Sequence, residues 1–221
     1  MISVIVPLRG EGPPRATVVA PLRGPGVELL LAADAGLSPE TVAAFETMGG
    51  RAVKLAAPRG ARLAAAAREA AGEILLFLHA DTVLPREWIE AVQLAVAKGA
   101  VGGAFRLAFE GGGVRMAWVA FWANLRTAVT KVPYGDQAPF VRRDVYERLG
   151  GHRPWPLLED LEFGERLRPA GKVVLLSPKV RTSPRRYLER GVARTVLQNW
   201  SILRRYRRGE SAEDLARLYR A

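Results

Sequence analysis

The chain has 221 residues, a length that favours one domain or one domain with a tail, and 49% of them are hydrophobic, as is ordinary for a globular protein. It contains no cysteine and two histidines, which excludes disulfides, a thiolate nucleophile, cysteine-ligated metals and a histidine-rich metal site. The net charge is +11, and the last 41 residues hold 11 arginines against 4 acidic residues, which favours a polyanionic partner.

The amino-terminal segment lacks the basic start and the long apolar run of a signal peptide. No stretch reaches the roughly 18 uncharged apolar residues that a membrane span requires. We therefore expect a cytoplasmic protein, peripheral on the inner face of the cell membrane if its basic tail contacts lipid.

Strands and helices alternate in the first half of the chain. Apolar runs rich in β-branched residues predict strands at residues 2–8, 27–33, 52–56 and 73–79. Helical patterns predict helices at 41–48, 59–71 and 85–97, with Ser38 and Pro39 opening the first and Gly72 capping the second. This alternation predicts an α/β fold with a mainly parallel central sheet flanked by helices.

Polar side chains follow three of these predicted strands. They are Arg9, Gly10 and Glu11 after the first, Asp34 after the second, and His79, Asp81 and Thr82 after the central strand. Ligands bind beyond the carboxyl ends of the strands in such sheets, so we expect these side chains to converge on one crevice.

The second half is less regular. We expect a strand at 101–109, an aromatic-rich helix at 114–130, a loop at 134–137, helices at 143–149 and 158–167, a strand at 172–177, and basic helices at 187–208 and 212–220. No internal repeat or long linker divides the chain.

Four short motifs carry the chemistry: F-L-H-A-D-T at 77–82, G-D-Q-A-P-F-V-R-R at 135–143, L-G-G at 149–151 and E-D at 159–160. Each has an ordinary alternative explanation when taken alone. Asp81 fits a turn after a strand, and Glu159 and Asp160 fit a helix start, where the dipole favours carboxylates.

In this order and spacing, together with the opening I-S-V-I-V-P, the motifs resemble the family 2 glycosyltransferases of the GT-A fold. They are most similar to the small bacterial group called selenodomain-associated transferase 2. The resemblance runs over about residues 1–205 and is strongest over 73–165. It implies a GT-A (Rossmann-like) domain at 1–180, with the nucleotide-sugar half at 1–100 and the acceptor and catalytic half at 101–180. The basic helical residues 181–221 form a carboxyl-terminal extension.

The resemblance implies an inverting, metal-dependent transfer of a hexosyl or related sugar from a nucleotide-sugar to an unknown acceptor. Asp81 is then the metal ligand, for Mg²⁺ or Mn²⁺, which the sequence does not distinguish. Asp160 is the base that takes the acceptor proton, with Glu159 beside it. The expected donor-binding residues are Pro7, Arg9, Glu11, Asp34, Arg62, His79, Ala80, Asp81, Gly135, Asp136, Gln137, Arg185 and Arg186.

The chain departs from the family pattern in its nucleotide half. Gly10 stands where the family's P-x-x-N-E motif has Asn, and Asp34 matches the Asp of V-D-G-G-S only with a shift of one residue. His79 replaces the first Asp of the D-x-D motif. The helix before it offers Arg59 and Arg62 in place of a polar Asn. An alternative function is therefore a catalytically impaired binding or accessory protein on the same fold.

The basic segment 187–208, which includes Trp200, and the aromatic segment 116–125 favour contact with an anionic membrane surface and with a lipid-linked acceptor. A peripheral membrane binder that acts through the arginine-rich tail is thus a further alternative. Packing of both segments against the core is the other explanation. Nucleic acid is disfavoured as a partner because charge alone is non-specific.

Overall fold

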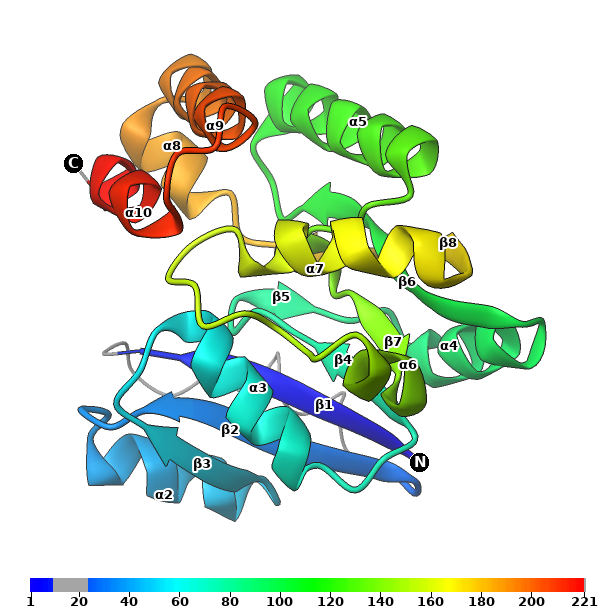
Figure 1. The fold of residues 1–221 in the computed structure, drawn as a ribbon. Coiled ribbons are helices and arrows are strands. Elements are labelled where there is room, and N and C mark those ends of the chain that lie inside the picture. The colour runs from blue at the N-terminus through cyan, green and yellow to red at the C-terminus, as the bar shows by residue number, and fades with distance from the viewer. Residues whose placement is uncertain (10–23, 221) are drawn as a thin grey trace.

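The computed structural model describes residues 1–9 and 24–220, and its core is an eight-stranded sheet (Figure 1). The strand order is β3-β2-β1-β4-β7-β6-β8-β5. Helices lie on both sides of this sheet, and each side has its own cluster of buried apolar residues. The expected α/β architecture with a mostly parallel sheet is confirmed.

The first half of the sheet is fully parallel. In it β1 (Ile2–Leu8) lies between β2 (Val27–Asp34) and β4 (Ile74–Phe77), and β3 (Arg51–Leu55) pairs with the outer side of β2. All four residues of β4 and six of the seven in β1 are buried. Strands covered on both faces read as continuous apolar runs, which is why the sequence predicts them well.

The second half of the sheet is mixed. The strand β7 (Phe140–Arg142) runs antiparallel to both β4 and β6 (Ala100–Phe109), whereas β8 (Lys172–Thr182) is parallel to β6. The two-residue β5 (Thr82–Val83) pairs antiparallel with the end of β8. Neither β5 nor β7 was expected from the sequence. The expected domain boundary at residue 180 falls inside β8.

The helices of the first half are α2 (Pro39–Thr47), α3 (Arg59–Glu69) and α4 (Trp88–Ala97). Ser38 caps α2 as expected, since its side chain accepts a hydrogen bond from the amide of Thr41 at 3.2 Å. The expectation that Gly72 caps α3 is wrong, because the helix ends at Glu69 and Ala70 is already extended. A Cβ atom at Gly72 would lie 2.6 Å from the Ser3 amide nitrogen, so close packing against β1 requires this glycine.

The later helices are α5 (Gly113–Thr130), α6 (Arg143–Arg148), α7 (Glu159–Leu167), α8 (Arg185–Arg190), α9 (Val192–Tyr206) and α10 (Ala212–Arg220), with 3₁₀ turns at Gly135–Gln137 and Arg168–Ala170. The single helix expected at 187–208 is wrong. Gly191, with φ of 85°, separates α8 from α9.

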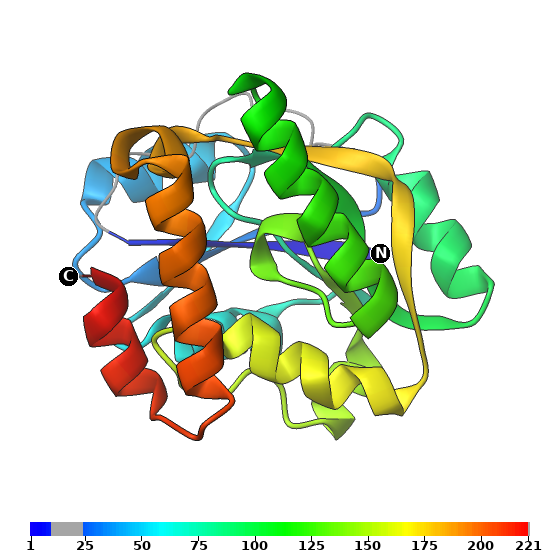
Figure 2. The ribbon, with the colours of Figure 1, turned by 90° about the horizontal axis from the view of Figure 1, so that it is seen from above.

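The helices α5 and α9 lie next to each other on one side of the molecule, as both ribbon views show (Figures 1 and 2). No helix in residues 24–220 is long and apolar enough to cross a membrane.

Candidate functional site

The residues that follow β4 form a tight turn at the carboxyl end of the strand. The amide of Thr82 donates to the carbonyl of His79 at 3.0 Å, and Ala80 between them packs against the core. Asp81 is exposed, and its Oδ1 atom receives long hydrogen bonds from the hydroxyls of Thr82 at 3.4 Å and Thr182 at 3.5 Å. Asp81 therefore presents a solvent-accessible carboxylate at the edge of the sheet where a ligand is expected.

Arg59, at the start of α3, links His79 to Glu159. Its Nη2 atom lies 2.5 Å from His79 Nε2, and its Nη1 atom lies 3.1 Å from Glu159 Oε1. Burial and the Arg59 charge hold the pKa of His79 well below its ordinary value, so Nε2 accepts the hydrogen bond from the guanidinium. Burial raises the pKa of Glu159, and Arg59 opposes this shift. Arg59 thus orients His79 and compensates a carboxylate that has no exposure to solvent.

Gly135 brings His79 and Asp160 together. Its amide donates to Asp160 Oδ2 at 2.5 Å, while the amide of Leu161 donates to Asp160 Oδ1 at 2.8 Å. A Cβ atom at Gly135 would lie 2.6 Å from His79 Nε2 and 2.7 Å from Asp160 Oδ2. The position requires glycine because both side chains contact the backbone there.

Asp136 adds a third carboxylate to this region. Its pKa is raised to about 6: burial is the largest cause, the positive charge of Arg126 opposes the shift, and the negative charges of Asp160 and Asp81 add to it. Its Oδ1 atom is buried without a hydrogen-bond partner in the part of the chain that the structure describes. Asp81, Asp136 and Asp160 therefore lie close enough to influence one another.

Gln137 has a different position from its two neighbours. Its side chain is fully buried, its Oε1 atom accepts from the hydroxyl of Thr127 at 2.7 Å, and its Nε2 atom donates to Asn124 Oδ1 at 3.4 Å. Both partners belong to α5. Gln137 therefore fixes the 135–137 turn on α5, and the next residue, Ala138, adopts a left-handed conformation with φ of 47°.

The L-G-G turn at 149–151 is tied to α7. The guanidinium of Arg166 donates to the carbonyls of Leu149 at 2.5 Å and Gly151 at 2.7 Å, and to both carboxylate oxygens of Glu162 at 2.6 Å. A planar guanidinium suits such convergent acceptors. This clamp holds the last turn of α7 against the L-G-G turn, and the Glu162 pair links it to the first turn.

A second cluster lies at the carboxyl ends of β1 and β2. Arg62 is buried, and its Nη1 atom donates to the carbonyls of Leu8 at 2.6 Å and Ala32 at 3.4 Å. Asp34 Oδ2 lies 4.0 Å from Arg62 Nη1 and 3.9 Å from Arg9 Nε. Arg9, Asp34 and Arg62 thus meet, as expected.

The two clusters adjoin each other, because Arg62 experiences the charges of Arg59 and Glu159 as well as those of Asp34 and Arg9. Of the other expected donor residues, Pro7 lies in β1. Glu11 lies outside the described residues.

The arginine pair at the start of α8 has separate surroundings. Arg185 is exposed, whereas the guanidinium of Arg186 lies 3.8 Å from the ring centre of Tyr219 in α10. The next residue, Tyr187, is electrostatically coupled to Asp136, whose charge, together with burial, raises the pKa of Tyr187. In α8 the side chain that interacts with Asp136 is thus Tyr187.

Sequence reasoning missed Arg126 as well as Tyr187. The guanidinium of Arg126 lies 3.3 Å from the ring centre of Tyr134, one residue before the G-D-Q turn. Its positive charge acts to lower the pKa of Asp136, against the effect of burial. A signal for Arg126 was present, because Asn124, Arg126 and Thr127 form a polar group that follows a long apolar run in the helix. No comparable signal marks Tyr187.

Among residues 1–9 and 24–220, no three acidic, histidine or cysteine side chains gather as a metal site. Asp81 fits a divalent cation as a single exposed oxygen ligand, provided that substrate oxygens supply the rest of the coordination.

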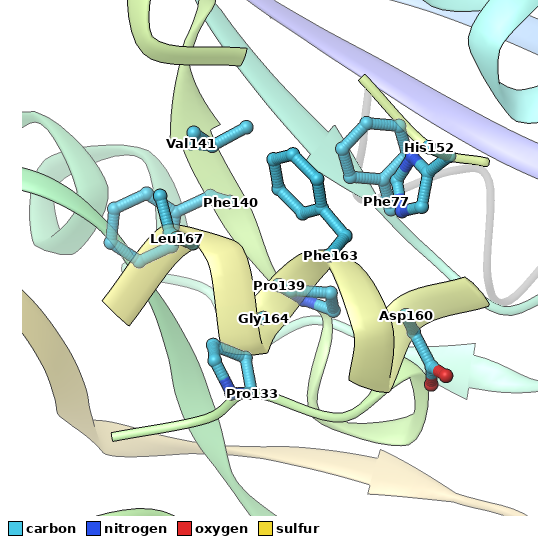
Figure 3. A pocket seen from close by; sticks show the side chains of 10 residues that line it. All are labelled: Phe77, Pro133, Pro139, Phe140, Val141, His152, Asp160, Phe163, Gly164 and Leu167. Carbon is cyan, nitrogen blue, oxygen red and sulfur yellow. The ribbon is translucent and has the colours of Figure 1, made fainter. Parts of the chain in front are cut away.

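A narrow pocket beneath α7 is lined mainly by apolar side chains such as Phe77, Phe140 and Phe163 (Figure 3). The carboxylate of Asp160 points away from the aromatic rings of this pocket. The pocket has almost no polar lining, so we assign it to core packing and not to binding of a polar substrate.

No family model matches the chain. The sequence is 30% identical to the O-antigen biosynthesis protein RfbC of Myxococcus xanthus over an alignment that covers 81% of this chain and 17% of that protein. The chain therefore spans less than a fifth of the relative's length.

Solved structures of other proteins have a fold similar to that of this chain. S. aureus TarS 1-349 in complex with UDP-GlcNAc has a TM-score of 0.59 and 14% identity, over 82% of this chain and 58% of that one. The mannosyltransferase PcManGT from Pyrobaculum calidifontis, in complex with GDP-Man and Mn²⁺, has a TM-score of 0.63 and 18% identity, over 81% and 56%. The resemblance implied by the motifs is thereby confirmed, and the chain has the GT-A glycosyltransferase fold.

Proposed function

We propose that this protein is a glycosyltransferase that moves a sugar from a nucleotide-sugar donor to an acceptor hydroxyl. The observation that carries the proposal is the convergence of His79, Gly135 and Asp160, with the Gly135 amide 2.5 Å from the Asp160 carboxylate. This convergence occurs on a fold that holds UDP-GlcNAc in TarS and GDP-Man in the mannosyltransferase.

Asp160 is the proposed base. Two backbone amides fix its carboxylate, which keeps its orientation while it accepts the proton of the acceptor hydroxyl. Glu159 is buried and paired with Arg59, so it positions the loop and does not act as a second base. An inverting transfer is a single direct displacement and needs only one base. The presence of one such carboxylate, Asp160, therefore supports an inverting transfer.

The nucleotide diphosphate leaving group carries negative charge, and the carboxylates near it repel that charge. A divalent cation, Mg²⁺ or Mn²⁺, held by Asp81 would neutralise the diphosphate. We assign Arg9, Asp34 and Arg62 to the nucleoside half of the donor, because they meet at the carboxyl ends of β1 and β2, and Asp136 to the sugar. Residues 1–100 then serve the donor, 101–180 the acceptor, and the extension from 181 completes the site through Tyr187. The location proposed is the cytoplasm, on the inner face of the membrane.

A thermal-shift panel of nucleoside diphosphates and nucleotide-sugars, with Mn²⁺ or with a chelator, tests this function. One nucleotide should raise the melting temperature of the wild type in a metal-dependent manner, and Asp81→Ala should abolish the shift. The matched control is Asp144→Ala, which removes an exposed carboxylate on α6.

The same nucleotide-sugar should then be consumed by the wild type in the presence of metal. Stabilisation without turnover toward any acceptor or water would favour the binding or accessory protein that the altered nucleotide half suggests. No stabilisation by any nucleotide would refute the proposed donor site.

A further inference from the structure

Large apolar side chains are exposed along α5 and, among arginines, on α9. We define the α5–α9 face as Val114, Trp118, Phe121, Trp122, Leu125 and Val129 of α5, with Leu197 and Trp200 of α9. The three tryptophans are 56%, 58% and 70% exposed. Exposed aromatic side chains that cluster as Trp118, Phe121 and Trp122 do mark an interaction site.

The inward side of α5 carries polar residues beside the buried Met116 and Ala120. Its polar residues Asn124 and Thr127 point inward, where Asn124 bonds the backbone of Leu107 and Thr127 bonds Gln137. The rings of Trp118, Phe121 and Trp122 pack on one another, with centroids 5.5 to 6.3 Å apart, outside the core. The polar anchors hold α5 in this orientation, so the aromatic cluster faces outward as part of the folded state.

Basic side chains surround the α5–α9 face. Residues 185–208 contain eight arginines and one glutamate, and α5 has Arg115 near its start, Lys131 just after its end and no acidic residue. Arg194, Arg204 and Arg208 are exposed on or next to α9. Exposed tryptophans within a basic border match the interface of an anionic bilayer, where indole rings lie at the headgroup level.

The distribution of charge favours an anionic membrane over a second copy of the chain as the partner of this face. A symmetric dimer through the α5–α9 face would place the arginines of the two copies opposite each other, and like charges across an interface disfavour association. An anionic membrane offers both an apolar layer for the rings and negative headgroups for the arginines.

We propose that the α5–α9 face docks on an anionic lipid membrane, with the tryptophans inserted at headgroup depth. One of these helices, α5, flanks the candidate site through Arg126, and α8, which precedes α9 in the chain, adds Tyr187; the charges of Arg126 and Asp136, and of Asp136 and Tyr187, influence one another. Both ribbon views show α5 and α9 on the same side of the molecule (Figures 1 and 2). Docking therefore holds the site against the bilayer surface, and, on the proposed function, the acceptor is an amphiphile whose hydroxyl lies at that surface.

Sedimentation of the full chain with lipid vesicles tests the docking. The wild type should bind vesicles of phosphatidylcholine with a quarter phosphatidylglycerol at least about tenfold more tightly than pure phosphatidylcholine vesicles. Trp118→Ser/Trp122→Ser and Trp200→Ser should each weaken binding about tenfold or more. The control Leu94→Ser, which removes an exposed apolar side chain from α4, should bind as the wild type does.

A triple variant combines Trp118→Ser, Trp122→Ser and Trp200→Ser. Brominated lipids should quench the tryptophan fluorescence of the wild type strongly and that of the triple variant much less. Equal binding by wild type and triple variant, or no binding to anionic vesicles, would overturn the proposal. So would a wild-type dimer of about twice 24.1 kDa that the same substitutions dissociate. Nucleotide stabilisation of the triple variant separates these outcomes from failure of the donor site, because the substitutions lie outside it.

Discussion

Asp160 is held by the backbone of two elements and has no cationic partner in the described part of the chain. Because the Gly135 and Leu161 amides donate to the two carboxylate oxygens, an asparagine keeps the size of the side chain but can accept only one of these bonds and loses the proton-accepting oxygen. We expect Asp160→Asn to lower kcat by about 10² to 10⁴. Donor affinity should change little, which steady-state kinetics and calorimetry together measure.

The matched control for this change is Asp144→Asn, which alters an exposed aspartate paired with Arg142 at the surface. It should leave kcat unchanged, because such surface pairs contribute little. Retention of near-normal kcat by Asp160→Asn would show that another group takes the proton.

Asp136 makes the stability of the fold depend on pH. Its pKa of about 6 in the folded state exceeds its ordinary value of 3.8, so folding favours the protonated form. The stabilising contribution of the protonated form is complete below about pH 4 and is lost as pH rises through about 6. At neutral pH the charged carboxylate therefore destabilises the fold by at most about 3 kcal/mol, at about 1.4 kcal/mol per pKa unit.

Asp136→Asn should remove this pH dependence. Denaturant unfolding should show the variant gaining stability relative to the wild type between pH 4 and pH 7, by up to about 3 kcal/mol. Asp144→Asn should give nearly the same difference from the wild type at both pH values. A constant difference for Asp136→Asn would mean that Asp136 titrates normally.

At the scale of the elements, α5 ends in a strained residue. Lys131 follows the helix with φ of 56°, a left-handed conformation that glycine adopts without cost. Lys131→Gly should therefore stabilise the protein by about 1 kcal/mol. Lys98 offers a matched control because it follows α4 with φ of −85°, so Lys98→Gly should destabilise or be neutral. Thermal and denaturant unfolding measure both, and destabilisation by Lys131→Gly would contradict the strain.

The elements predicted best from the sequence are those whose apolar pattern is long and local. The strands β1, β2 and β4 are buried on both faces, and their runs of apolar residues made them visible. The three-residue β7 was missed because it exists only through pairing with β4 and β6, far away in the sequence. A signal for it was present in β6, where a Cβ atom at Gly102 would lie 2.7 Å from the carbonyl oxygen of Phe140.

The site likewise contains residues that a local pattern reveals and residues that only long-range packing brings in. Motif residues such as Asp81 and Asp160 could be found because Asp81 follows a recognisable strand and Asp160 lies in the first turn of a recognisable helix. Arg126 and Tyr187 could not be assigned to the site, because only the tertiary path of α5 and α8 brings them to Asp136. The outward orientation of the aromatic residues in α5 was also left open, since periodicity gives the faces of a helix without saying which one meets the core.

For the whole molecule, the site lies at the junction of two half-sheets. The parallel half ends in β4, which carries His79 and Asp81 after its last residue, and the mixed half begins with β7, which follows the 135–137 turn. The antiparallel pairing of β4 with β7 therefore brings the two motifs together.

Charge across the molecule has two opposing effects on a nucleotide diphosphate. Three carboxylates, Asp81, Asp136 and Asp160, lie near the proposed binding position, whereas the chain as a whole carries +11. On the proposed function, the long-range field would attract the anion, and the metal would act only at close range. Electrostatic attraction of this kind speeds association by about 10-fold to 10³-fold and is screened by salt.

The association rate of the nucleotide that stabilises the protein should therefore fall about tenfold or more between 20 and 500 mM NaCl, at constant Mn²⁺. The screening length shrinks from about 20 Å at 20 mM salt to about 4 Å at 500 mM salt, which removes the long-range attraction. Stopped-flow tryptophan fluorescence measures the rate. The corresponding nucleoside, which lacks the phosphates, is the control and should associate at a rate that salt hardly changes. A salt-independent rate for the diphosphate would show that the net charge of the chain does not assist donor capture, and would leave the arginines of α8 and α9 to act at the membrane alone.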